Sequence, residues 1–329
     1  MIFAEIPYPR IDPVAIDLPG PIDIRWYGLM YLVGFVAGYA ILRQLIRRGW
    51  LPMTEAALSD LVTAAIVGVI AGGRLGYMLF YDLPDLLREP ARLLRIWEGG
   101  MSFHGGLIGM LLAVAWTARR HRLPFLRLGD AVALAVPPGI FAVRIANFIN
   151  GELYGRVASP EVPWAMRFPT DPVAERLLGV DTLPLRAREL AIKHAYETGL
   201  WDRVRPFVPL RHPSQLYEAL GEGLLVGLVV WGLYRAFGRT DRWPPGALGG
   251  AFLIAYGTVR FGLEFFRQPD PQFRNPGDPL GTVLGPFTMG QVLCFAMILA
   301  GAAVMVLAWR RARRGGDHAP RAPAAATAR

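Results

Sequence analysis

Mostly apolar stretches alternate with short polar segments along nearly the whole chain. A hydrocarbon layer of about 30 Å requires roughly 20 apolar residues of helix to cross it. Seven segments meet this requirement: residues 26–46, 61–81, 101–118, 129–151, 215–234, 246–266 and 287–309. Because backbone groups inside lipid must bond within their own segment, the pattern predicts an all-α polytopic membrane protein with seven transmembrane helices.

Arginines in the short connecting loops predict the orientation of these helices. They follow the first, third, fifth and seventh segments, as Arg47, Arg48, Arg119, Arg120, Arg122, Arg239, Arg242, Arg310, Arg311, Arg313 and Arg314. Short loops rich in arginine face the cytoplasm. We therefore expect the N-terminus outside and the C-terminus in the cytoplasm.

The segments between the predicted helices define the domain organisation. Residues 1–314 are expected to form one transmembrane domain, and residues 315–329 a disordered cytoplasmic tail. Residues 152–214 are expected to form a periplasmic cap segment. An amphipathic helix predicted around residues 186–200 lies either on the outer lipid surface or within a compact cap, and we favour the compact cap.

The composition agrees with a membrane protein, since 53% of the 329 residues are hydrophobic and 19% are charged. The net charge of +9 does not indicate nucleic acid as a partner, because the basic residues punctuate apolar segments. The only cysteine, Cys294, cannot form an internal disulfide and is interpreted as a small apolar residue of the last helix. The first 20 residues lack a basic segment typical of signal peptides, so no cleavable signal is expected.

Ionisable residues within the predicted helices gather toward the outer leaflet. Eight residues from five helices share this depth: Arg74, His104, Arg144, Glu152, Glu218, Glu222, Arg260 and Glu264. Each is costly in lipid unless it is paired or hydrated. Arginine suits planar two-point binding of phosphate, which favours an enzyme acting on phospholipid. A scaffold held by internal ion pairs and a solute transporter remain alternatives, although no inverted repeat is evident and the inner halves carry almost no charge.

Glycine pairs flank one of these residues, His104, within residues 99–106. Small residues allow close helix packing, and they also let backbone amides reach an anion. A histidine in an apolar helix is usually a hydrogen-bonded core residue, yet this one belongs to the charged group. Both interpretations of His104, structural and catalytic, remain open from the residues alone.

Residues 144–155, Arg-Ile-Ala-Asn-Phe-Ile-Asn-Gly-Glu-Leu-Tyr-Gly, closely resemble the signature of the prolipoprotein diacylglyceryl transferases, which are bacterial inner-membrane enzymes. Residues 26–31, 72–77, 99–106, 211–218 and 264–270 support the resemblance in the family's order. Together these blocks cover nearly everything from Tyr8 to Arg314. Val143 and Ala146 stand where family members often have glycine.

The resemblance implies a reaction. The diacylglyceryl group of phosphatidylglycerol passes to the lipobox cysteine thiol of a prolipoprotein signal peptide, which forms a thioether and releases glycerol phosphate. The implied location is the bacterial inner membrane, among membrane lipids, with the active site toward the outer leaflet and periplasm. Neither cofactor nor metal is expected, since the five histidines show no close-spaced ligand pattern.

The resemblance also assigns roles to residues. It implies catalytic roles for His104, Arg144, Arg260, Glu152 and Tyr27. It implies substrate binding by Arg144, Arg260, Asn147, Gly155, Tyr256, Glu264, Arg74 and His212. His104 matches the proposed base, but it can equally position the substrate or leaving group. His212 either caps a helix or meets the incoming peptide, and the structural role is favoured.

Overall fold

A computed structural model describes residues 6–18, 23–95, 100–238, 243–269, 278 and 280–314. The predicted tail, residues 315–329, lies outside the described residues, as do Gly99, Arg239, Arg242 and Asp270 of the sequence motifs. The chain divides into two units. The first comprises Met1–Gly34, Val136–Val229 and Phe252–Ala302, and the second Phe35–Ala135, Val230–Ala251 and Ala303–Arg329.

The described part of the chain is mostly helical, as predicted. Five helical stretches are long and apolar enough to cross a membrane: α1 (Trp26–Arg47), α2 (Glu55–Phe80), α5 (Phe125–Ala135) continued by α6 (Pro137–Ile149), the stretch Ser214–Ala236 and α13 (Met289–Arg313). The other two predicted segments are also helical, as α4 (Phe103–Arg120) and α12 (Ala247–Leu263). The fold is therefore that of an all-α membrane protein with five long apolar helices.

Several predicted helix boundaries were wrong; for example, α5 begins at Phe125 rather than at residue 129, and α13 ends at Arg313 rather than at residue 309. Helix α2 begins at Glu55 rather than at residue 61, because Thr54 caps it by accepting a hydrogen bond from the backbone N–H of Ala57 at 3.2 Å. Helix α13 begins only at Met289, because the two preceding residues form a strand, β4 (Phe287–Thr288). This strand pairs antiparallel with β3 (Thr282–Leu284).

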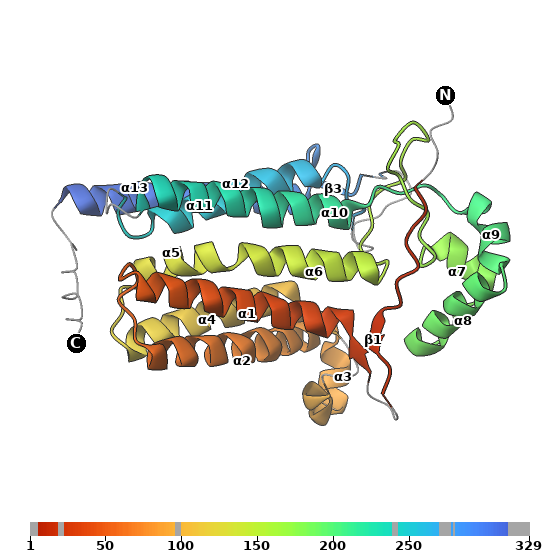
Figure 1. The fold of residues 1–329 in the computed structure, drawn as a ribbon, viewed down its shortest axis with the longest axis horizontal. Coiled ribbons are helices and arrows are strands. Elements are labelled where there is room, and N and C mark those ends of the chain that lie inside the picture. Colours follow the sequence, from red (N-terminus) through yellow and green to blue (C-terminus); the bar gives the residue numbers. More distant parts are fainter. Residues whose placement is uncertain are drawn as a thin grey trace, which may run out of the picture. The chain divides into compact units, whose positions relative to one another are not determined.

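In the second unit, α2 and α4 pack side by side through glycines (Figure 1). A Cβ atom added to Gly72 would collide with the carbonyl of Gly105, and one added to Gly68 would collide with the carbonyl of Gly109. Such close approach excludes any side chain. The packing interpretation of Gly105 is thus confirmed, and Gly72 is the residue that it packs against. The segment that connects the two helices contains the short helices α3 (Leu83–Arg88) and η1 (Pro90–Leu94).

In the first unit, the segment after α6 forms a small helical cap. It contains α7 (Pro172–Leu178), α8 (Leu185–Glu197), α9 (Leu200–Val204) and η3 (Arg205–Phe207). A buried cluster joins these elements: Ala174, Trp201, Val204 and Val208, with Leu178 and Tyr196 packed against it. A helix, α8, is present where the amphipathic helix was predicted.

A second antiparallel pair of strands, β1 (Val14–Ile16) and β2 (Ile24–Arg25), precedes α1. Strands of two or three residues are too short to leave an alternating pattern, so the sequence analysis missed both pairs.

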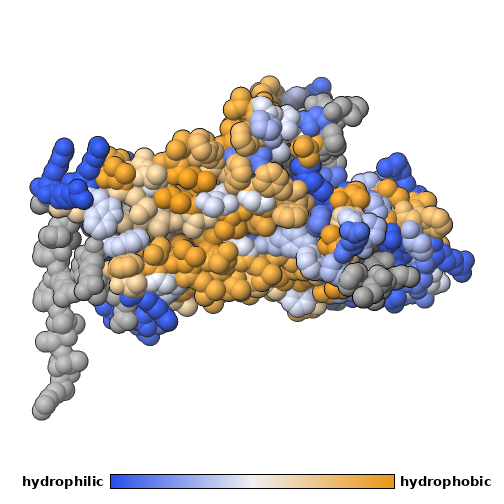
Figure 2. Space-filling view, turned by 90° about the horizontal axis from the view of Figure 1, so that it is seen from above, coloured by the Kyte–Doolittle hydropathy of each residue, from blue (hydrophilic) through white to orange (hydrophobic). Residues whose placement is uncertain are grey.

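Many large apolar side chains remain exposed along the helices, among them Leu32, Val36, Val67, Leu112 and Leu299. Figure 2 shows such residues gathered at the surface over the helical part of the molecule. Soluble proteins rarely expose apolar surface on this scale. The surface therefore suits a hydrocarbon solvent.

Cys294 is buried in α13, as the sequence suggested.

Candidate active site

Two arginines and two glutamates form an alternating ring in the first unit. Arg144 comes from α6 and Arg260 from α12, whereas Glu218 ends α10 (Ser214–Glu218) and Glu222 lies in a π-helical stretch, η4 (Ala219–Leu225). Arg144 contacts Glu218 at 3.0 Å and Glu222 at 3.2 Å. Arg260 contacts the same carboxylates at 3.2 and 3.6 Å. Each carboxylate thus bridges both guanidinium groups.

Burial makes this ring costly to disrupt. Glu218 and Glu222 are buried, and the side chains of Arg260 and Arg144 are 10% and 17% exposed. Removing one partner of such a pair leaves an uncompensated buried charge. Alternation of signs around the ring is the arrangement that offsets this cost for all four groups.

Further polar residues extend the ring to both sides. Arg260 also contacts Glu264 at 2.8 Å, and Arg267 approaches Glu218 at 3.9 Å. Three arginines and three glutamates therefore sum to zero formal charge. Thr288 donates a hydrogen bond to Glu264 at 3.2 Å, and the Tyr256 hydroxyl donates one to Glu222 at 3.3 Å.

Some acceptor capacity of the ring is unused. Among the described residues, Oε2 of Glu218, Oε1 of Glu222 and Oε2 of Glu264 receive no hydrogen bond, although an arginine lies within ion-pair distance of each. Buried acceptors normally have a donor partner. These oxygens are therefore suited to hydroxyl donors from a ligand.

The turn after α6 presents Glu152. Gly151, with φ of +66°, ends the helix, and Asn147 and Asn150 donate side-chain hydrogen bonds to one oxygen of the Glu152 carboxylate at 2.9 and 3.2 Å. Glu152 itself is exposed. The conformation needs positive φ, which glycine adopts without strain. Two amides from one helix end thus orient an accessible carboxylate.

Gly155 lies where three chain segments meet. Its N–H donates to the carbonyl of His212 at 2.8 Å, and it forms an antiparallel bridge with Arg267. A Cβ atom at Gly155 would collide with the carbonyl of Phe266 and stand 2.9 Å from the Cβ of His212. The observed contacts of Gly155 are therefore packing contacts, which hold Arg267 beside the ring.

His212 has well-defined neighbours in the same region. Its Nδ1 lies 3.2 Å from the hydroxyl of Tyr217, which accepts a hydrogen bond from Trp164 at 2.6 Å. The Phe266 ring packs edge-on at 5.2 Å. Burial lowers the pKa of His212. Because the indole N–H only donates, the Tyr217 hydroxyl is free to donate to a neutral His212.

Two tyrosines from the N-terminal part of the chain, Tyr8 and Tyr27, lie near α6, the helix that carries Arg144. Tyr27, in the first turn of α1, packs against Tyr31 with tilted rings whose centroids are 5.2 Å apart, and it lies within electrostatic range of Arg144 and Glu152. Tyr8 donates to the last carbonyls of α6, those of Phe148 and Ile149, at 2.6 and 2.9 Å. Its burial raises the pKa of the Tyr8 hydroxyl, which therefore acts as a neutral cap of the helix end.

Arg74 and His104 belong to the second unit. Arg74 is buried and donates to the carbonyls of Arg92, Leu93 and Gly100, at 2.6, 3.4 and 3.4 Å. These contacts organise the segment between α2 and α4, which is a structural role. His104 is exposed in the first turn of α4, two residues after the cap residue Ser102.

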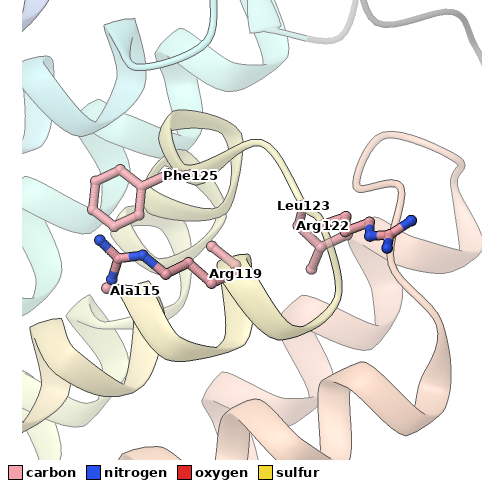
Figure 3. Close-up of a pocket in the computed structure, with 6 residues that line it drawn as sticks. Ala115, Arg119, Arg122, Leu123 and Phe125 are labelled. Carbon is pink, nitrogen blue, oxygen red and sulfur yellow. The ribbon is translucent and has the colours of Figure 1, made fainter.

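A shallow hollow in the second unit does not resemble a phosphate site. It is lined by Ala115, Ala118, Arg119, Arg122, Leu123 and Phe125. Figure 3 shows Arg119 alongside Phe125, while Arg122 points away from them. The two guanidinium groups do not converge, so the hollow offers no two-point clamp for an anion.

The structure thus brings together many of the predicted site residues within one unit, and it adds others. Arg144, Arg260, Glu264 and Tyr256 share the ring and its flanks. Sequence reasoning placed Glu218 and Glu222 in the charged group but gave them no role in the site. Their spacing of four residues was the available signal, because it places both on one helix face. Tyr8 and Arg267 had no comparable signal.

Among the described residues, no group of three or more His, Cys, Asp and Glu that could hold a metal ion is present.

Comparison with known proteins identifies relatives over nearly the full length. Residues 13–307 match the family model described as prolipoprotein diacylglyceryl transferase. A protein of Nitrobacter hamburgensis named phosphatidylglycerol–prolipoprotein diacylglyceryl transferase is 41% identical over 331 residues, covering 99% of this chain and 96% of its own. Proteins of the same name from Geobacter sulfurreducens and Sodalis glossinidius are 42% and 45% identical, each covering 92% of this chain and 98% and 95% of their own.

Proposed function

The chain belongs to the prolipoprotein diacylglyceryl transferase family, and we propose that it transfers the diacylglyceryl group of phosphatidylglycerol to the lipobox cysteine of a prolipoprotein. This is the first step of lipoprotein maturation. The sulfur of the acceptor cysteine forms a bond to the glycerol carbon, and the bond from that carbon to the phosphate oxygen breaks. The electron pair leaves with glycerol phosphate, and the thiol proton passes to a base.

One observation carries the assignment of the phosphate site. Arg144 is anchored by two buried glutamates through Nη1 and Nη2, and its side chain is the more exposed of the two ring arginines. A guanidinium has five N–H donors in one plane, and these contacts engage only part of them. Arg144 therefore keeps N–H donors for the lipid phosphate. Arg260, with three ion-pair contacts, adds positive charge near the phosphate as negative charge builds on the leaving group.

The unused carboxylate oxygens suggest why phosphatidylglycerol is the donor lipid. Its headgroup carries glycerol hydroxyls, which donate hydrogen bonds, and one oxygen each of Glu218, Glu222 and Glu264 receives no hydrogen bond among the described residues. A site built to bond a substrate hydroxyl discriminates strongly against an analogue without it. A lipid with a bare phosphate, such as phosphatidic acid, is expected to be a poor donor.

The remaining residues receive roles of two kinds in this proposal. His104 acts as base or positions the leaving group, with Glu152 and Tyr27 as further catalytic residues and Asn147 holding Glu152 in place. Tyr256 and Glu264 shape the headgroup site. Gly155, His212 and Arg74, predicted to contact substrate, are better explained as residues that hold chain segments in position.

The proposal includes the membrane arrangement. The chain crosses the bacterial inner membrane seven times, with α4 and α12 as the two shorter crossings. The N-terminus and the cap, residues 152–214, face the periplasm, and the C-terminus faces the cytoplasm. Arginine clusters after alternate helices support this orientation.

The direct test uses the purified protein in detergent with phosphatidylglycerol and a lipobox peptide. Glycerol phosphate should appear together with a peptide heavier by one diacylglyceryl group, and a peptide with serine in place of cysteine should give neither. Release of glycerol phosphate without modified peptide would indicate a phospholipase instead. Absence of both products from folded protein would refute the proposed transfer.

A further inference from the structure

One face of α8 carries a regular series of charged and aromatic residues. Arg186, Glu189, Lys193 and Tyr196 are separated by three, four and three residues, so they lie along one side of the helix. The buried residues of α8 are Ile192 and Ala195, and Tyr196 also packs against the buried cluster of the cap.

The series on α8 contacts the N-terminal segment at every position. Arg186 pairs with Asp23 and, at 3.7 Å, with Asp17; Glu189 pairs with Arg25; Lys193 pairs with Asp12 at 3.1 Å; and Tyr196 packs under Arg10 at 4.8 Å. We refer to these contacts as the N-terminal clasp. Because they occupy the charged face of α8, that face is engaged with protein.

The charges of the clasp set a register. On α8, the order Arg186, Glu189 and Lys193 alternates plus, minus and plus, and it meets Asp23, Arg25 and Asp12, which alternate minus, plus and minus. Asp23 and Arg25 lie next to α1, whereas Asp12 precedes β1, so the partners come from two parts of the N-terminal segment. Moving α8 by one contact would place Arg186 beside Arg25 or Glu189 beside Asp23 and bring like charges together. Such juxtaposition is repulsive, so only one alignment is favoured.

The contacts nearest to α1 are the best protected from solvent. The side chain of Asp23 is 6% exposed, and those of Arg25 and Glu189 are 29% and 20% exposed, whereas Lys193 and Asp12 are exposed. Exposed pairs contribute little, and partly buried pairs contribute more. The clasp is therefore strongest at β2, which leads directly into α1 and Tyr27.

We propose that α8 positions Tyr27 for the transfer reaction, with Glu189 holding Arg25 of β2 and Arg186 holding Asp23, the residue before β2. This inference rests on the proposed function. Tyr27 is the second residue of α1, so a displacement of β2 moves it relative to Arg144 and Glu152. Glu189 and Arg25 act as positioning residues, since their contacts are with each other.

A charge exchange tests the positioning role. Arg25→Glu creates a repulsive pair with Glu189 and should lower kcat by about tenfold, because misplacement of a reacting group by about 1 Å is enough for such losses. KM for phosphatidylglycerol should stay within about twofold, because the ring is intact. The double variant Arg25→Glu with Glu189→Arg restores opposite charges and should recover at least about a third of wild-type kcat. Failure of the exchange to recover activity in folded protein would overturn the inference.

Arg188 supplies a matched control on the same helix. It pairs with Glu175 of α7 at 3.0 Å, and the two side chains are 29% and 13% exposed, close to the values of the Arg25–Glu189 pair. This pair lies within the cap and makes no contact with β2 in the described structure. Arg188→Gln should leave kcat within about twofold. A loss equal to that of Arg25→Glu would show a general effect of cap stability and would contradict the inference.

A double-mutant cycle with Tyr27→Phe identifies the residue through which the clasp acts. If Arg25→Glu acts through Tyr27, its effect on kcat should largely disappear in the Tyr27→Phe background. Full additivity, with an active wild type and an impaired Tyr27→Phe, would overturn the positioning of Tyr27 and leave the transfer function standing. Absence of thioether product from the wild type would instead refute the transfer function itself.

Discussion

Nη1 of Arg144 lies 3.0 Å from Oε2 of Glu218, and both side chains project from helices into the interior of one unit. The pair is one side of a ring in which each arginine is held by two carboxylates. A guanidinium fixed in this way needs no rearrangement of its own to meet a phosphate. Preorganised charge of this kind is usually the largest single contribution to catalysis.

The geometry of Arg144 predicts that a positive charge alone, without the planar guanidinium, does not support the reaction. Arg144→Lys keeps the charge but cannot contact both Glu218 and Glu222 while also binding phosphate. The activation free energy for kcat/KM should rise by about 2 kcal/mol or more, about as much as in Arg144→Ala. Folded yield in detergent is measured beside the rate, so that loss of a buried partner is not mistaken for loss of catalysis. Near wild-type glycerol phosphate release by Arg144→Lys would rule out two-point phosphate binding.

The balance of three arginines and three glutamates predicts the effect of removing one negative charge. Glu222→Gln leaves the ring with one excess positive charge and keeps an acceptor for Tyr256. KM for phosphatidylglycerol should fall by about threefold or more, because the anionic headgroup then restores balance at short range. Glu264→Gln is the control, since Glu264 contacts Arg260 but not Arg144, and its effect should be smaller. An unchanged or higher KM for folded Glu222→Gln would contradict this view of the ring.

The close packing at Gly155 predicts loss of folded protein. Gly155→Ala forces the backbone of Phe266 away and should cost about 1–3 kcal/mol of stability, which thermal unfolding and folded yield detect. Gly262→Ala in α12 is the control, because no atom lies within 4 Å of the position its Cβ would take. A Gly155→Ala variant that is as stable as wild type but inactive would point to substrate contact instead.

Burial of His212 predicts a pH-dependent contribution to stability. Its pKa is lowered in the folded state, so the unfolded chain binds a proton first as the pH falls below about 6.5. The His212 contribution is therefore present above that pH and is lost as the pH falls through the folded pKa. His212→Gln should lose less thermal stability than wild type between about pH 8 and about pH 5.5. Equal losses for both proteins would mean that His212 titrates alike in the folded and unfolded chain.

The proposed orientation predicts where a single residue is accessible. Lys193 is the only lysine in the sequence, and its side chain is 58% exposed in the cap. A membrane-impermeant amine reagent should label it from the periplasmic side of intact spheroplasts. Lys193→Arg serves as the control for labelling of the terminal amine. Labelling of Lys193 only after lysis would reverse the orientation, and with it the outer-leaflet position of the ring.

The sequence by itself determined the helical membrane class, the approximate extent of the helices, the family and the presence of ionisable residues within apolar helices. These follow from local properties: apolar length is written along the chain, and an ionisable residue in an apolar helix is visible wherever it stands. The structure corrected the starts of α2 and α13, because caps and very short strands depend on a few residues without a period.

Pairing was decided only by the tertiary structure. The sequence could not show that Glu218 and Glu222 each bridge Arg144 and Arg260, that Arg74 holds carbonyls of residues 92, 93 and 100, or that the charged face of α8 meets residues 10–25. In each case many partners of the right charge were available along the chain. The choice among them depends on which helices pack together, and that is set by contacts between residues far apart in sequence, such as the glycines that bring α2 and α4 into register.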